Sequence, residues 1–102
     1  MSSINFIEIS IENTNQVIYI KINVKDNLID INNKQRNISN EKIEGLLRII
    51  RTWESVYEGE IIDNEKFMIR ITGEDYVDKI KGNGSYPSNY RMFKDWIGEV
   101  YE

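Results

Sequence analysis

The sequence predicts one α+β domain over residues 1–102. It comprises an antiparallel sheet of five or six strands in the order βββα(β)ββα, with two amphipathic helices packed on one face. The first third alternates apolar and polar residues, which is typical of half-buried strands. Two later segments space their apolar residues as helices do. The helices do not alternate strictly with the strands, so a doubly wound parallel sheet is disfavoured.

The first two strands form a hairpin. Isoleucines at 7, 9 and 11 share one face, and the segment 18–24 repeats this alternation. A loop at 13–16 pairs residues whose numbers sum to 29, so Ile7 faces Ile22 and apolar residues meet on one face. A slip of one residue would place them on opposite faces.

A third strand follows a turn at Asp26-Asn27, two residues that tolerate positive φ. This turn pairs residues whose numbers sum to 53, so that Ile22 faces Ile31. The polar residues 32–37 then read as a connection without regular structure.

The first helix is expected to begin at Ser39, a good N-cap, and to end near Gly59. Gly45 in its interior indicates close backbone packing. The last helix follows Pro87-Ser88-Asn89. Helical spacing relates the apolar positions Ile43, Leu46, Leu47, Ile50, Trp53 and Tyr57 of the first helix, and Tyr90, Phe93, Trp96 or Ile97, Val100 and Tyr101 of the last.

Residues 66–81 read as a second hairpin that turns at 73–75. Ile61 and Ile62 are candidates for a short edge strand before a turn at Asp63-Asn64. The segment 82–85 lacks the Gly-Lys-Ser/Thr of a P-loop and the third glycine of a dinucleotide loop. We therefore interpret it as a turn that uses glycine to reach positive φ.

The residues that are missing argue against enzymatic activity. The chain has no Cys and no His, which excludes disulfides, thiolate nucleophiles, catalytic triads and imidazole metal ligands. General acid–base chemistry would need a carboxylate or lysine with a shifted pKa. Glu58, Glu60, Asp63 and Glu65 lack the sequence of a calcium loop. We therefore expect that the protein is not an enzyme and that it binds no metal or cofactor.

The net charge of −4 is concentrated in the middle of the chain. Residues 54–78 hold eight acids and two bases, a local charge of −6, whereas each flank carries +1. One interpretation is a negative surface that binds a basic partner. The other is a set of solvated turns. The candidate partner-binding residues are Glu58, Glu60, Asp63, Glu65, Glu74, Asp75 and Asp78.

Aromatic residues gather near the C-terminus beside several bases. They could stack on single-stranded nucleic acid, but helical spacing and the negative net charge favour core packing instead. An aromatic left exposed would suit a protein interface. The aromatic residues are Tyr86, Tyr90, Phe93, Trp96 and Tyr101.

The sequence also indicates a cellular location. No apolar run approaches the length of a membrane span, and Met1-Ser2-Ser3 leads into a strand pattern without a basic or apolar leader. We expect a cytoplasmic protein.

Part of the chain resembles a known group. Four motifs resemble small uncharacterised proteins of low-GC Gram-positive bacteria, clostridial ones especially. They are Trp53 and Tyr57, Ile62-Asp63, the strand Phe67-x-Ile69-x-Ile71, and Gly82-Asn83-Gly84-x-Tyr86-Pro87-x-Asn89-Tyr90. In these proteins the same glycine-turn element opens the last helix. The resemblance covers roughly residues 50–97. It implies a fold and a bacterial source, and it assigns no activity or site residue.

The leading functional hypothesis is a small cytoplasmic protein-interaction module, of the inhibitor or immunity type, that binds another protein through the acidic surface of residues 54–78. The alternative is a homo-oligomeric structural domain, for example a homodimer. A protein that mimics or binds nucleic acid is the less favoured third hypothesis.

Overall fold

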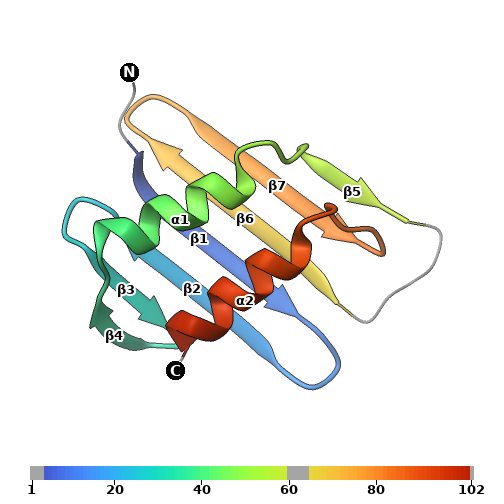
Figure 1. Cartoon of the computed structure of the whole chain (residues 1–102), viewed down its shortest axis with the longest axis horizontal. Coiled ribbons are helices and arrows are strands. Elements are labelled where there is room, and N and C mark those ends of the chain that lie inside the picture. The colour runs from blue at the N-terminus through green and yellow to red at the C-terminus, as the bar shows by residue number, and fades with distance from the viewer. Residues whose placement is uncertain (1–3, 60–64, 102) are drawn as a thin grey trace.

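The computed structural model describes residues 4–59 and 65–101, and its element order is ββββαβββα (Figure 1). The elements are β1 (Ile4–Glu12), β2 (Val17–Asn23), β3 (Leu28–Ile31), β4 (Lys34–Asn37), α1 (Asn40–Ile50), β5 (Val56–Glu58), β6 (Lys66–Gly73), β7 (Val77–Asn83) and α2 (Tyr90–Tyr101).

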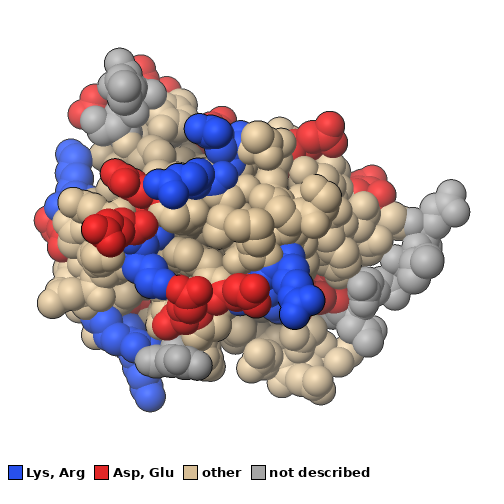
Figure 2. Space-filling model, in the orientation of Figure 1, with Lys and Arg blue, Asp and Glu red and all other residues tan. Residues whose placement is uncertain are grey.

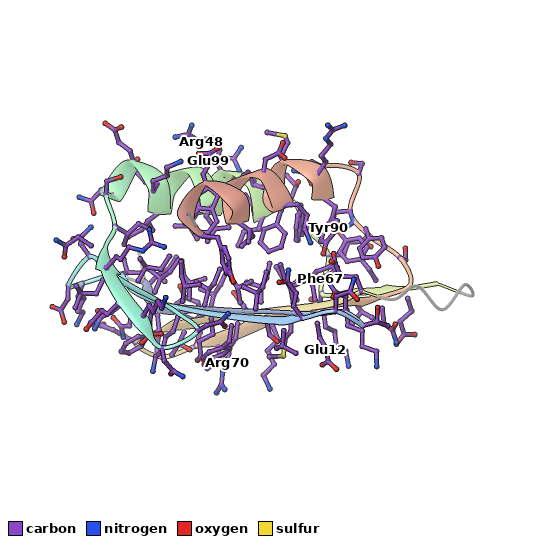
Figure 3. All side chains as sticks on the ribbon, turned by 90° about the horizontal axis from the view of Figure 1, so that it is seen from below. Glu12, Arg48, Phe67, Arg70, Tyr90 and Glu99 are labelled. Carbon is purple, nitrogen blue, oxygen red and sulfur yellow. The ribbon has the colours of Figure 1, made fainter. Side chains whose placement is uncertain are left out.

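The fold is α+β, with both helices on one face of the sheet (Figures 1 and 3). The described part of the sheet has seven strands in the order β4-β3-β2-β1-β6-β7-β5, rather than the five or six expected. The additional strands lie at its two edges. The pairing of β5 with β7 is parallel, so the sheet is mixed, although mostly antiparallel. Neither described helix is long and apolar enough to cross a membrane.

The register of the first hairpin is confirmed, because Ile7 pairs with Ile22. On its other side β1 pairs with β6, which places Ile69 beside Ile9 and Phe67 beside Ile11. Buried side chains therefore form continuous rows across β2, β1 and β6. These rows make the floor on which the helices pack.

The register of the second hairpin was predicted wrongly by two residues, because Ile22 pairs with Ile29 rather than Ile31. The Asn23 side chain accepts a hydrogen bond from the Asp26 amide at 3.2 Å and donates one to its carboxylate at 3.1 Å. Asn27 has a φ of 53°. The turn therefore spans 24–27. A shift of two residues keeps every side chain on its predicted face.

The expectation of an irregular connection at 32–37 is wrong. Asn32 and Asn33, with φ of 48° and 73°, form a two-residue turn. The strand β4 then pairs with β3. All four residues of β4 are polar and exposed, so hydrophobic periodicity gave no sign of it.

The start of α1 is confirmed, but its end was predicted wrongly. The Ser39 hydroxyl accepts a hydrogen bond from the Lys42 amide at 3.1 Å. The helix stops at Ile50, and residues 56–58 join the sheet instead. Ser55 and Gly59 hydrogen-bond to the β7 backbone at 2.9 and 3.1 Å. The helical spacing of Trp53 and Tyr57 was coincidental.

The two helices pack side by side over the sheet. Trp96 Nε1 donates to the Lys42 carbonyl at 2.9 Å, and Lys42 forms an ion pair with Glu99. Both Trp96 and Ile97 are buried. A Cβ added to Gly45 would lie 4.0 Å from Trp96 Nε1, so the expected close backbone packing there is wrong.

The 66–81 hairpin is confirmed, and β7 continues to Asn83. Gly84 has a φ of 80°, which confirms that the glycine turn reaches positive φ. Gly82 has another function, because it leaves room for the Phe67 ring. The predicted strand at Ile61-Ile62 and turn at Asp63-Asn64 lie outside the described residues.

Two glycine substitutions should have opposite effects on stability. A Cβ at Gly82 would overlap the Phe67 ring, whereas one at Gly98 meets nothing within 4 Å. Gly82→Ala should lower the free energy of unfolding by about 1–3 kcal/mol through overpacking. Gly98→Ala should raise it by about 0.5–1 kcal/mol through helix propensity. Urea denaturation measures both, and a neutral Gly82→Ala would contradict the packing.

Candidate functional site

The described candidate acids of residues 54–78 lie near the two ends of β6. Glu58 and Glu65 lie near its start, and Glu74, Asp75 and Asp78 lie in or beside the turn that follows it. The eight residues of β6 separate the two groups by roughly 23 Å. On the helix-covered face, acids and bases are interleaved (Figure 2). The described candidates therefore do not share one surface, and Glu60 and Asp63 lie outside the described residues.

The bases of the β6–β7 hairpin share the open face of the sheet, opposite the helices. They are Lys66, Arg70, Lys79 and Lys81. Asp78 alternates with Lys79 and lies on the helix side. Figure 3 shows Arg70 and Glu12 pointing away from the helices. Summing the charges of residues 54–78 therefore does not show the basic strip. Assigning the side chains of each strand alternately to the two faces would have predicted it.

Glu65 anchors α2 to the start of β6. Its carboxylate accepts hydrogen bonds from Tyr90 Oη at 2.5 Å and from Lys94 Nζ at 2.8 Å, with Asn13 Nδ2 at 3.4 Å. The Tyr86 hydroxyl donates to the Glu65 carbonyl at 2.7 Å. The side chain is only 19% exposed. These bonds tie together three segments that are distant in the sequence.

The environment of Glu65 lowers its pKa. Burial raises the pKa, but hydrogen bonds from Lys94 and Tyr90, the charge of Lys94 and the bond from Asn13 outweigh it. A general acid at neutral pH needs a raised pKa. Glu65 is therefore an ionised anchor. Among the described residues, no three acidic side chains are grouped so that they could hold a metal ion.

Most of the C-terminal aromatics pack in the core. Trp53, Tyr57, Phe67, Tyr86, Tyr90 and Phe93 form a cluster of ring pairs with centroids 4.6–6.5 Å apart. Figure 3 shows Phe67 and Tyr90 between the helices and the sheet. Tyr101 is 45% exposed. The prediction of core packing is thus confirmed for Tyr86, Tyr90 and Trp96.

Asn89 connects the two helices' ends through its side chain, a role that the sequence did not reveal. Its Oδ1 accepts from Trp53 Nε1 at 2.6 Å, and its Nδ2 donates to the Ile49 carbonyl at 3.0 Å. Together with the Glu65 bonds to Tyr86 and Tyr90, these contacts give the Tyr-Pro-x-Asn-Tyr element a structural role.

An open groove of about 890 Å³ lies between α1 and the first half of β7. Its apolar lining comes from α1 and from the strands β1, β6 and β7. In Figure 1 this part of β7 extends beyond the cover of α1. The apolar residues include Ile4, Leu47, Ile71 and Ile80. The sequence did not predict the groove, because residues from four separate elements form it.

In the part of the chain that the structure describes, the backbone edge of β7 is unpaired beside this groove. β5 pairs only with residues 81–83, and no described residue extends the ladder along 77–80. The Lys81 amide donates to the Ser55 carbonyl, so odd-numbered residues of β7 face this edge. The N–H and C=O groups of Val77 and Lys79 therefore point outward along it.

The groove carries opposite charges at its two ends. Glu44 and Asp78 lie at the end near the start of β7, whereas Arg51 lies toward β5, with Arg48 between them. Glu44 and Arg48 of α1 and its C-cap residue Arg51 follow one face of the helix at i, i+4 and i+7. Glu74 and Asp75, in the adjoining turn, add to the acidic end. Of the acidic candidates, Asp78 lines the groove, and Glu74 and Asp75 lie in the turn before β7.

Replacing Glu65 with glutamine should produce a pH-dependent loss of stability. The lowered pKa means that the charged carboxylate stabilises the fold above its unfolded pKa, and that this stabilisation is lost as the pH falls through the folded pKa. Glu65→Gln should lower the free energy of unfolding by about 1 kcal/mol at neutral pH.

The difference between wild type and Glu65→Gln should shrink as the pH falls below the ordinary pKa of a glutamate and through the lowered pKa of Glu65. Exposed Glu54 provides a control, since Glu54→Gln should change stability by less than about 0.5 kcal/mol. Denaturation at several pH values measures this, and a pH-independent difference would contradict the role given to Glu65.

Comparison with known proteins found no protein-family model and no curated protein that matches this chain. The resemblance of residues 50–97 to clostridial proteins stays a prediction.

Proposed function

We propose that the protein is a protein-interaction module that binds an extended segment of a partner protein in the groove between α1 and β7. The observation that carries this proposal is a coincidence of two features at the same four residues. The outward backbone edge of residues 77–80 adjoins the apolar groove. The segment would add to β7 as a further strand, on the edge that β5 occupies beside residues 81–83.

Strand addition explains why an open edge and a groove belong together. Backbone hydrogen bonds to Val77 and Lys79 supply affinity that does not depend on the sequence of the partner. Side chains of an added strand point alternately to its two faces. Those on the helix side would contact Leu47, Ile71 and Ile80, which favour apolar side chains in the partner.

The charges at the groove ends specify the rest of the partner segment. Its apolar centre should be flanked by a base near Glu44 and Asp78 and by an acid near Arg51. This proposal keeps the expectation of a protein partner. It gives a role to the acidic candidates near the 73–77 turn and none to Glu58 or Glu65.

Two synthetic peptides test the proposal. Each has seven residues and alternates valine with threonine, one with lysine first and glutamate last, the other with the two charges exchanged. Fluorescence anisotropy should show that one order binds more tightly. Leu47→Gln should weaken this binding about tenfold, because a half-buried apolar contact is lost.

Met92→Gln is the matched control, since Met92 lies on α2, is 57% exposed and is not among the groove residues. It should leave peptide binding unchanged. Equal binding of both peptides, unaffected by Leu47→Gln, would contradict the proposal, as would no binding up to about 1 mM.

A further inference from the structure

The open face of the sheet carries charge of opposite sign on its two halves. On the β1–β3 side it presents Glu8, Glu12 and Asp30 with one base, Lys21. On β6 and β7 it presents Lys66, Arg70, Lys79 and Lys81. The boundary lies between β1 and β6. Glu58 on β5 borders the basic half.

Apolar side chains are exposed along the same face. Met68 lies at its centre, 40% exposed, opposite Ser10 on β1 and Lys81 on β7. Tyr19 and Val56 continue this row at 43% and 45% exposed. This row runs across the strands and through both charged halves, and its exposed apolar members offer contact surface that the surrounding charges can orient.

We propose that a second copy of this chain packs face to face on the open side of the sheet. The two-fold axis lies between the two sheets, parallel to the strands and along the β1–β6 boundary. It places the basic half of each copy over the acidic half of the other. A two-fold axis across the strands would instead place like charges together, so the charge pattern selects the first arrangement.

Sheets that pack face to face keep their strands within about 30° of one another. In this arrangement β1 of each copy faces β6 of the other. Glu12 and Lys66, which pair across β1 and β6 within one chain, lie at the same level along the strands. Each therefore also faces the opposite charge of the second copy.

Nucleic acid fits this face less well than a second copy. The basic strip is two strands wide, and Glu8 and Glu12 lie on the adjacent strand, where they would repel phosphates. The chain as a whole carries −4. A second copy uses both halves of the face, whereas a polyanion uses only one.

Charge reversal with complementation tests the dimer. Sedimentation of the wild type at low salt should give a mass that approaches twice 12.1 kDa as concentration rises, and that falls again at high salt. Glu12→Lys and Lys66→Glu, both at exposed positions, should each raise the dimer Kd at least about tenfold. An equimolar mixture of the two variants should dimerise again.

The mixture of the single variants separates the dimer contact from the pairing within one chain, because it restores opposite charges only between the two copies. The double variant Glu12→Lys/Lys66→Glu complements this test. It restores both, so it should dimerise as the wild type does, with circular dichroism showing that each variant is folded. A wild type that stays monomeric at about 1 mM and low salt would overturn the proposal. A mixture of the single variants that stays monomeric would also overturn it. Nucleic-acid binding would be favoured instead if a labelled single-stranded oligonucleotide bound tightly, Lys66→Glu abolished this binding and Glu12→Lys strengthened it.

Discussion

The structure depends on the pairing of β1 with β2 on one side and with β6 on the other. Both registers align Ile7, Ile9 and Ile11 with apolar residues on the helix side of the neighbouring strands. A slip of one residue on either side would expose a row of these isoleucines and bury charges such as Glu8 and Arg70. This parity gives the sheet one apolar face, and the burial of that face fixes where both helices must lie.

The proposed binding surfaces lie where the helices and β5 leave the sheet uncovered. Because α1 stops at Ile50 and the chain returns to the sheet only at Val56, β5 reaches just the second half of β7. No strand in residues 4–59 or 65–101 pairs with the outer edge of the first half, which lies beside α1. Because side chains alternate between the two faces, the bases of β6 and β7 lie on the opposite face, next to the acids of β1. One set of constraints thus produces a groove and a charge-divided face.

The sequence predicted the features that depend on alternation and missed those set by single side chains or distant segments. The first register and the faces of the strands follow from periodicity. The β2–β3 register differs from the prediction because the Asn23 side chain caps a longer turn. The strand β4 was missed because all of its residues are polar. Trp53 continued a helical spacing that the Asn89 bond and the β5 pairing override. The groove joins α1, which ends at Ile50, to β7, which begins at Val77. Because these segments are distant in the sequence, no local pattern indicates it.

The central claim is that the start of β7 is an open strand edge beside the groove, and amide hydrogen exchange of the free protein tests it most directly. Residues 78 and 80 direct their amides to β6, whereas Val77 and Lys79 direct theirs outward. The amides of Val77 and Lys79 should exchange rapidly, and those of Asp78 and Ile80 slowly. Equal, strong protection at all four positions would show that this edge is already covered.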